Sequence, residues 1–214
     1  MDRIELLASL AKDSNVLLDV GCDHALTIIK AIKYYNVKKA IASDISIGPL
    51  MAAKKNIENN NLIDKITIIQ SDGLKNINEE FDTLIISGMG GYLIKDILND
   101  SLNKIKNKLL ILEANNNRYI LRKFLSENNF KIIDEYAIYD NLKYYEIIVA
   151  KTGNSSLTEK ELKYGPILMK KKSKEFIKFY QDKINFIDSI INTINDENKK
   201  KLKLEEKEEY LSLL

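Results

Sequence analysis

The chain has 214 residues, of which 45% are hydrophobic and 30% charged, and its net charge is only +2. This composition is typical of a globular protein with one full α/β domain and a small additional module. The single cysteine and the single histidine exclude an internal disulfide and the usual two- or three-histidine metal sites, so we expect no metal. No apolar run reaches the ~18 residues of a membrane-spanning helix, and the N-terminus lacks the features of a signal peptide. We therefore expect a cytoplasmic protein with no membrane partner.

Short apolar runs alternate with segments of helical periodicity from the N-terminus to about residue 150. Several runs are apolar throughout, as expected for parallel strands covered on both faces. The predicted strands are Val16–Val20, Ala40–Asp44, Ile66–Gln70, Thr83–Ser87, Leu109–Glu113, Phe130–Tyr139 and Tyr144–Lys151. The predicted helices are Leu26–Tyr35, Pro49–Asn60, Tyr92–Asn99 and Tyr119–Asn128. The last two strands leave no room for a helix between them and should be antiparallel, so residues 1–152 are predicted to form a doubly wound α/β sheet.

A second unit, residues 153–214, begins within a stretch of small and polar residues at Thr152–Ser156. Heptad spacing of apolar residues predicts one long helix over Ile167–Ile194, and a shorter helix follows the break at Asn195–Asn198. The apolar positions are Ile177, Tyr180, Ile184, Ile187, Ile191 and Ile194 in the first helix and Leu204, Leu211 and Leu214 in the second. We expect an antiparallel helical hairpin.

Lysines are concentrated in this second unit, where Lys163–Lys183 contains seven of them against two acidic residues. A basic patch on a nearly neutral protein suits a polyanionic partner. A solvated helix face explains the same pattern, and charge alone favours this simpler explanation slightly. Tyr164, Phe176 and Phe179 have helical spacing and are better explained as hairpin core than as platforms for stacking bases.

The loop after the first predicted strand indicates what kind of ligand the sheet binds. It reads DVGCDHA over Asp19–Ala25, at the position where doubly wound folds bind nucleotides. Gly21 matches the first glycine of a dinucleotide-binding GxGxxG motif, but Asp23 replaces the second, and its carboxylate would repel a pyrophosphate. S-adenosylmethionine has no phosphate and carries two cationic groups, so the loop favours that cofactor over NAD. Packing or capping explains His24 as well as chemistry does, and Cys22 is interpreted as a small residue lining the loop.

Acidic residues also follow the second and third predicted strands. Asp44 lies 23 residues after Gly21, a distance at which a carboxylate accepts hydrogen bonds from ribose hydroxyls. Asp72, followed by Gly73, is placed to reach an adenine amino group. Each of these aspartates alone suits a turn or a helix cap. Carboxylates at three successive strand ends, with Asp19 as the first, indicate a nucleoside cofactor.

The fourth predicted strand is followed by GMGG, Gly88–Gly91. Glycines let the backbone approach a flat ligand closely and leave space above the methyl group of the cofactor, although a simple turn explains them too. The Asn/Asp-Pro-Pro-aromatic motif common in enzymes that methylate exocyclic amines of nucleic acids is missing.

Together these motifs resemble the bacterial TrmK family, the tRNA (adenine(22)-N(1))-methyltransferases. The matching segments are DVGCDHA at 19–25, SDI with the following GP at 43–49, SDGL at 71–74, SGMGG at 87–91, YEIIVA at 145–150 and YGPIL at 164–168. The resemblance covers nearly the whole chain. It implies a Rossmann-like class I methyltransferase sheet with a coiled-coil-like helical hairpin, S-adenosyl-L-methionine as cofactor, and methylation of adenine N1 at position 22, in the D-arm of tRNA.

The resemblance and the loop chemistry together give the expected site residues. Those for the cofactor are Asp19, Gly21, Asp23, His24, Asp44, Asp72, Gly73 and Gly88. Those for the target base are Met89, Gly90, Gly91, Asn115 and Tyr145, and those for the tRNA backbone are Lys170, Lys171, Lys172 and Lys174. No catalytic base is assigned, because the ring nitrogen N1 of adenine has an in-plane lone pair and loses no proton before attack; catalysis then rests on positioning.

One departure from the family concerns the end of the fifth strand. The family typically shows Gln-Pro-Asn there, whereas this chain has Glu113-Ala114-Asn115. Two other functions remain open at this stage: a small-molecule methyltransferase with the same cofactor loops, and a non-catalytic RNA-binding module that keeps the fold. An obligate protein partner is not inferred.

Overall fold

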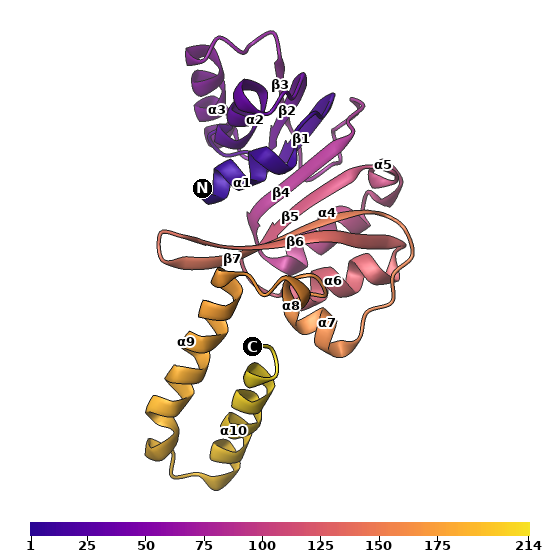
Figure 1. Ribbon diagram of the computed structural model, residues 1–214. Coiled ribbons are helices and arrows are strands. Elements are labelled where there is room, and N and C mark those ends of the chain that lie inside the picture. The colour runs from indigo at the N-terminus through magenta and orange to yellow at the C-terminus, as the bar shows by residue number, and fades with distance from the viewer.

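The computed structural model of the chain describes residues 1–214 and contains a seven-stranded sheet flanked by helices (Figure 1). The strands are β1 (Val16–Val20), β2 (Lys39–Asp44), β3 (Ile66–Gln70), β4 (Thr83–Met89), β5 (Leu109–Ala114), β6 (Phe130–Asp140) and β7 (Lys143–Thr152). Their order in the sheet is β3-β2-β1-β4-β5-β7-β6. Strands β1 to β5 are parallel, and β7 pairs antiparallel with both β5 and β6. The predicted doubly wound sheet with a late antiparallel pair is confirmed.

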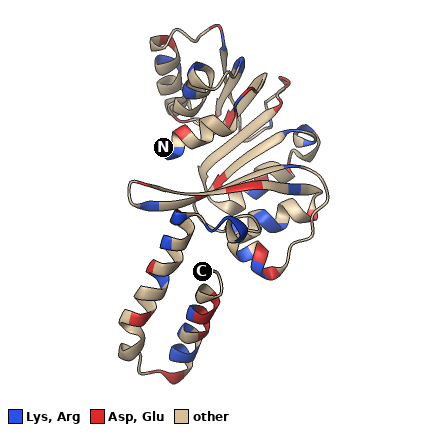
Figure 2. Ribbon diagram, viewed as in Figure 1, with Lys and Arg blue, Asp and Glu red and all other residues tan.

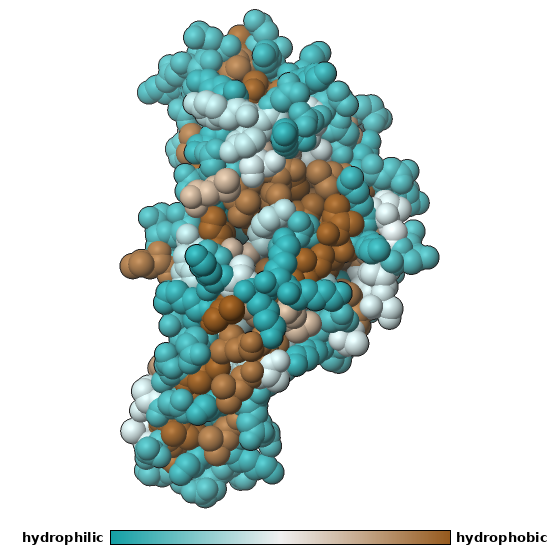
Figure 3. All heavy atoms as spheres, viewed as in Figure 1, coloured by the Kyte–Doolittle hydropathy of each residue, from teal (hydrophilic) through white to brown (hydrophobic).

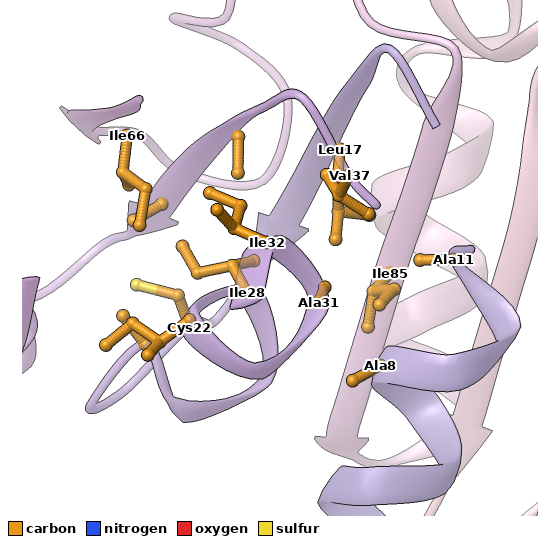
Figure 4. Packing of buried hydrophobic residues seen from close by; sticks show 14 of the residues in the cluster. Ala8, Ala11, Leu17, Cys22, Ile28, Ala31, Ile32, Val37, Ile66 and Ile85 are labelled. Atoms are coloured by element: carbon orange, nitrogen blue, oxygen red, sulfur yellow. The ribbon is translucent and has the colours of Figure 1, made fainter. Parts of the chain in front are cut away.

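Helices cover both faces of the sheet. They are α1 (Arg3–Leu10), α2 (Leu26–Tyr34), α3 (Ile47–Asn59), α4 (Gly91–Asn99), α5 (Leu102–Ile105), α6 (Arg118–Glu127), α7 (Glu159–Tyr164), α8 (Leu168–Lys171), α9 (Lys174–Ile190) and α10 (Glu197–Leu211), with a short 3-10 turn at Ile191–Thr193. Adjacent strand residues serve opposite faces, so Leu17 packs with α1 to α3 while Leu18 packs with α4 to α6. Figure 4 shows the first of these two cores, with Ala8 of α1 and Ile28 of α2 beside the strands. Apolar side chains on both sides explain why the strands read as uninterrupted hydrophobic runs.

The predicted strands agree with the observed ones to within two residues at every end, and the four predicted helices of the sheet domain are all present. Helix α1 was not predicted. Its first turn is capped by Asp2, whose carboxylate accepts a hydrogen bond from the backbone N–H of Glu5 at 2.6 Å. Leu7 and Ala8 on one side of α1 are buried against the sheet, so this helix closes the edge where β1 and β4 end.

The single long helix predicted over Ile167–Ile194 is wrong, because the chain breaks inside it. Lys172 adopts a left-handed conformation with φ of 45°, which ends α8. Ser173 then caps a new helix, α9, by accepting a hydrogen bond from the backbone N–H of Phe176 at 3.3 Å. The heptad pattern spans a change of direction, so spacing alone did not reveal the break.

Helices α9 and α10 lie side by side and antiparallel below the sheet (Figure 1). Contrary to the sequence interpretation, Leu204 and Leu211 do not form the apolar seam: they are 43% and 51% exposed, and no residue of α10 is buried. Leu213, just beyond the helix, joins Tyr180 of α9 in a small core, and the partly buried Tyr210 and the predicted Leu214 pack against it. The hairpin is therefore anchored at its base and mostly polar along α10.

A buried ionic network joins the C-terminal segment to the sheet. Arg122 of α6 is fully buried, and it donates hydrogen bonds to Glu135 of β6 at 2.8 Å and to Glu146 of β7 at 2.7 Å. Glu135 also accepts the backbone N–H groups of Ile167 and Leu168, where α8 begins, at 2.8 and 3.3 Å. Burial lowers the pKa of the Arg122 guanidinium, but the charges of the two glutamates outweigh it and raise the pKa above its usual value. The network thus holds α8 and the hairpin against strands β6 and β7.

No helix of the structure could cross a membrane. The longest, α9, has 17 residues and carries charged side chains along its length (Figure 2).

Candidate functional site

A cavity of about 230 Å³ opens at the carboxyl ends of β1 and β4, beneath α1. It brings together five of the predicted cofactor residues, namely Asp19, Gly21, Asp23, His24 and Gly88. The remaining lining residues are Arg3, Ile4, Leu7, Cys22, Leu26, Thr27 and Ser87. Because carboxyl ends of parallel strands are where doubly wound sheets bind ligands, the cavity lies at the expected place.

Asp19 is the buried acid of this cavity. Only 3% of the residue is exposed, and burial, followed by the charge of Asp44, raises the pKa of its carboxyl from 3.8 to about 7. A cationic group bound beside Asp19 would offset both effects and favour the ionised form. The site is therefore built to take a positive charge.

The backbone of the first loop is held in a shape that requires glycine. Gly21 has φ of +74°, and its N–H donates to the carbonyl of Ser43 on β2 at 2.8 Å. A Cβ at Gly21 would come within 2.2 Å of the Met89 side-chain methyl. Met89 from the fourth strand therefore rests directly on the cofactor loop, which joins the two predicted halves of the site.

Cys22 and Asp23 of the loop have different environments. Cys22 points into the core beside Ile28 (Figure 4), and burial raises the pKa of its thiol well above the usual range, which agrees with a structural role. Asp23 is 71% exposed at its side chain, and its carboxylate lies 3.6 Å from His24 Nε2. These two exposed polar groups form the rim of the cavity.

Asp44 and Asp72 lie outside the cavity that contains Asp19. Asp44 ends β2 and accepts a hydrogen bond from the N–H of Ser46 at 2.9 Å, which shapes the turn into α3. Asp72 is ion-paired with Lys75 at 2.5 Å and lines a separate small hollow together with Gly73. The charge of Asp44 still raises the pKa of Asp19, so Asp44 and Asp19 lie near each other at the same edge of the sheet.

The predicted base-pocket residues cluster where β4 and β5 end. The Asn115 side chain donates to the carbonyl of Gly88 at 2.6 Å, and its backbone N–H donates to the carbonyl of Met89 at 2.8 Å. Lys143 donates to the Asn115 side chain at 3.3 Å, and its ammonium lies 4.9 Å from the ring centre of Tyr145. The structure thus brings Gly88, Met89, Asn115 and Tyr145 together.

Gly90 and Gly91 support this cluster from behind. A Cβ at Gly91 would come within 2.4 Å of the carbonyl oxygen of Asn117, whereas one at Gly90 would come within 3.2 Å of Asn116. Gly91 is therefore required for close packing of α4 against the loop before α6.

Two residues of the site were missed by sequence reasoning, Arg3 and Glu113. Glu113 is completely buried, and its Oε2 accepts from Arg3 Nη1 at 2.7 Å and from the N–H of Gly88 at 2.9 Å. A helix-start signal in the sequence would have revealed α1, and with it Arg3: Asp2 is followed three residues later by Glu5 and then by an apolar helix face.

The four predicted tRNA-backbone lysines have unequal surroundings. Lys171 is ion-paired with Asp134 and lies 4.0 Å from the ring centre of Tyr136, and Lys172 donates to the carbonyl of Leu214 at 3.0 Å. The two others, Lys170 and Lys174, are exposed at the start of the hairpin and form no ion pair. Only these two are free to contact a partner without breaking an internal bond.

The polar groups of the cavity fit S-adenosylmethionine. One buried carboxylate, from Asp19, and one guanidinium, from Arg3, line a single cavity, as a zwitterionic amino-acid moiety requires. The Arg3 Nε and the Oε1 of its ion-pair partner Glu113 are both buried and have no hydrogen-bond partner. No group of three metal-ligating side chains lies close together.

Comparisons with known proteins agree with this geometry. The family model described as TrmK, tRNA (adenine(22)-N(1))-methyltransferase, matches residues 17–213. A curated relative, the tRNA (adenine(22)-N(1))-methyltransferase of Bacillus subtilis, is 32% identical over 94% of this chain and 90% of its own.

Two solved structures similar to this chain contain S-adenosyl-L-methionine or its product. A Streptococcus pneumoniae protein in complex with S-adenosyl-L-methionine matches with a TM-score of 0.88 and 32% identity, over 100% of both chains. The M. capricolum TrmK in complex with S-adenosyl-homocysteine matches with a TM-score of 0.83 and 28% identity, over 98% of this chain and 95% of that one.

Proposed function

Because the chain belongs to the TrmK family, we propose that it transfers the methyl group of S-adenosylmethionine to N1 of adenine 22 in the D-arm of tRNA. The observation that supports this most directly is the joint edge of β1, β4 and β5. There a cavity with a buried acid, Asp19, adjoins the cluster of Gly88, Met89 and Asn115. A cofactor site and a site for a flat base are thus neighbours.

Positioning is the main contribution of the protein to the reaction. N1 of adenine attacks with a lone pair in the ring plane, so no side chain has to remove a proton first. Asn115 binds the carbonyl of Gly88 and Glu113 binds its N–H, so both hydrogen-bonding groups of Gly88 are held by the end of β5. This rigid loop sets where a base can lie relative to the cofactor, and orientation of this kind contributes several kcal/mol to catalysis.

The site also favours the charge that the product carries. Methylation at N1 leaves the adenine ring cationic, and the carboxylate of Asp19 at the same strand edge stabilises a positive charge nearby. Tyr145 adds an aromatic ring near Asn115, and the Arg3 guanidinium and the Lys143 ammonium each lie 4.9 Å from the centre of this ring.

We also propose that residues 153–214 contact the tRNA. The target base lies within a structured arm, and exposing it costs a few kcal/mol, which contacts elsewhere on the tRNA would offset. Lys170 and Lys174 are the free cations at the junction of sheet and hairpin. Since tRNA is found in the cytoplasm, that is where we propose the enzyme acts.

A methyl-transfer assay with labelled S-adenosylmethionine tests this function against its rivals. Purified protein is offered unmodified tRNA transcript and, separately, a panel of small metabolites. We expect label in the tRNA only. Label in a metabolite and none in tRNA would make the protein a small-molecule methyltransferase, and cofactor binding without transfer to either would make it a non-catalytic module.

A further inference from the structure

The turn between β6 and β7 carries an apolar side chain that the fold leaves uncovered. Leu142 is 97% exposed, more than any other large apolar residue of the chain. Asp140 pairs with Lys143, so the turn has two central residues, Asn141 and Leu142, with φ of 47° and 65°. A two-residue turn with positive φ at both positions favours glycine at the second, because a Cβ is crowded in this conformation. Leucine is therefore unfavourable here for both backbone and solvation, and it contributes little to packing.

The turn projects from the edge of the sheet at which the cofactor cavity opens. Strand β7 runs antiparallel to β5, with Ile147 opposite Glu113, so the residues before Ile147 extend past the end of β5. Lys143, next to Leu142 in the chain, donates to the Asn115 side chain at 3.3 Å. Figure 1 shows the turn standing clear of the other strands, and Figure 3 shows hydrophobic atoms at its tip. Leu142 is thus one residue away from the cluster where β4 and β5 end.

The surroundings of Leu142 suit a polyanion. Leu142 lines two hollows, one of about 610 Å³ against the first turns of α9 and one of about 590 Å³ against the middle of that helix. The charged residues of the two hollows are Lys143, Lys174, Lys178 and Lys183 on one side of the balance and Glu175 and Asp182 on the other. Cations on either side of the turn match the phosphates of a nucleic-acid strand, whereas one apolar side chain is far smaller than a protein interface.

The proposed reaction requires an apolar group of this kind. Adenine N1 is not accessible while the base is stacked and paired in the arm, so the base has to leave the stack. Proteins that unstack and kink DNA insert apolar side chains, leucine among them, between neighbouring bases.

We propose that Leu142 enters the base stack of the D-arm and occupies the space that adenine 22 leaves. The inference rests on the proposed function, and it adds the residue that keeps the target base exposed. Lys143, beside it, links the turn to Asn115, so insertion of the turn and placement of the base occur at one edge of the protein.

The test replaces Leu142 with glycine, the residue that the turn itself favours, so the melting temperature of Leu142→Gly should not fall. Two transcripts are compared: the intact tRNA, and one with an abasic site opposite adenine 22, in which the base is already unpaired. We expect kcat/KM of the variant to fall by about 10- to 100-fold on the intact tRNA and to stay within about threefold of wild type on the abasic transcript, because unstacking costs least for an unpaired base.

Two further variants serve as controls. Leu142→Met keeps an apolar side chain and should restore kcat/KM on the intact tRNA. Ile63 is also an apolar turn residue, 56% exposed, but it lies before β3 at the opposite edge of the sheet. Ile63→Gly should therefore leave the ratio of kcat/KM for the two transcripts unchanged.

A fluorescent base measures the exposure directly, since 2-aminopurine at position 22 brightens when it leaves the stack. At saturating protein the wild type should raise its emission, and Leu142→Gly should raise it less. Equal loss of kcat/KM on both transcripts, no loss on either, or the same brightening by both proteins would overturn the role of Leu142 alone. Failure of the wild type to methylate either transcript would overturn the proposed function, and this inference with it.

Discussion

The cofactor edge and the C-terminal hairpin are built in different ways. At the cofactor edge, backbone groups are fixed by short contacts within the sheet, as where Gly21 and Cys22 both donate to the carbonyl of Ser43. In the hairpin, α10 buries no residue, and its contacts with α9 include the aromatic pair of Tyr210 with Tyr180 and the ion pair of Lys207 with Asp188. Figure 3 shows a strip of hydrophobic atoms along the lower end of the molecule, bordered by hydrophilic ones. The conformation of the cofactor edge is therefore set by local contacts, whereas that of the hairpin is set by a few contacts at its base. Substitutions should affect the two regions differently.

The largest expected effect is at the anchor of the hairpin. Arg122→Leu leaves Glu135 and Glu146 buried without their cation, which we expect to lower the free energy of unfolding by about 3–5 kcal/mol. Urea unfolding measures it. Lys178→Leu, which removes an exposed pair with Asp182, is the control and should change it by less than about 1 kcal/mol. Equal losses of unfolding free energy in the two variants would contradict the role of Arg122 in anchoring the hairpin.

Gly21→Val should nearly abolish cofactor binding. The φ of +74° is strained for valine, and its Cβ would collide with Met89. We expect the Kd of S-adenosylhomocysteine to rise by about 100-fold, equivalent to roughly 2–3 kcal/mol.

Gly48 provides the control for this prediction. A Cβ there meets nothing within 4 Å, so Gly48→Ala should bind as wild type does. If Gly21→Val kept its affinity, the close approach of Met89 to the loop would not matter for the cofactor.

Cofactor affinity should depend on pH through Asp19. Its pKa of about 7 means that the acid is neutral below that pH, and a bound cation requires the ionised form. We expect affinity to fall by up to about tenfold per unit as the pH drops below 7 and to level off above it. Asp19→Asn should flatten the profile.

The same pKa shift predicts how the ligand-free protein responds. Between about pH 4 and 7 the folded state keeps a proton on Asp19 that the unfolded state has lost, so its contribution to stability decreases as the pH rises through this window. Thermal unfolding across this range, compared with Asp19→Asn, measures it. A wild-type stability that changed with pH just as the variant does would contradict the raised pKa.

The smallest effect concerns the hairpin as a tRNA contact. Lys170→Glu/Lys174→Glu should weaken tRNA binding by about tenfold and lower the slope of log K against log salt by about 2, while sparing the cofactor. Lys38→Glu/Lys39→Glu makes the same change of charge at the amino end of β2, away from the hairpin, and should change tRNA binding little. Equal losses in both variants would assign the effect to overall charge.

The same contrast explains what could be predicted from the sequence. Strands β1 to β5 and the loop around Gly21 depend on local patterns, apolar runs and glycine conformation, and the fold class and strand positions were predicted from these. The break at Lys172 and the exposure of Leu204 depend on where α8 meets β6 and on how α10 lies against α9, which periodicity does not encode. Arg3 was missed because it reaches the cavity through a contact 110 residues away in the chain.

The atom and the nucleotide that receive the methyl group test the proposed function most directly. Unmodified tRNA transcript is incubated with the protein and methyl-labelled S-adenosylmethionine, digested, and analysed by nucleoside mass spectrometry. We predict labelled 1-methyladenosine, absent when adenine 22 is replaced by guanine. Label that persists in the substituted transcript, or that appears in another nucleoside, would contradict the assignment of substrate and site.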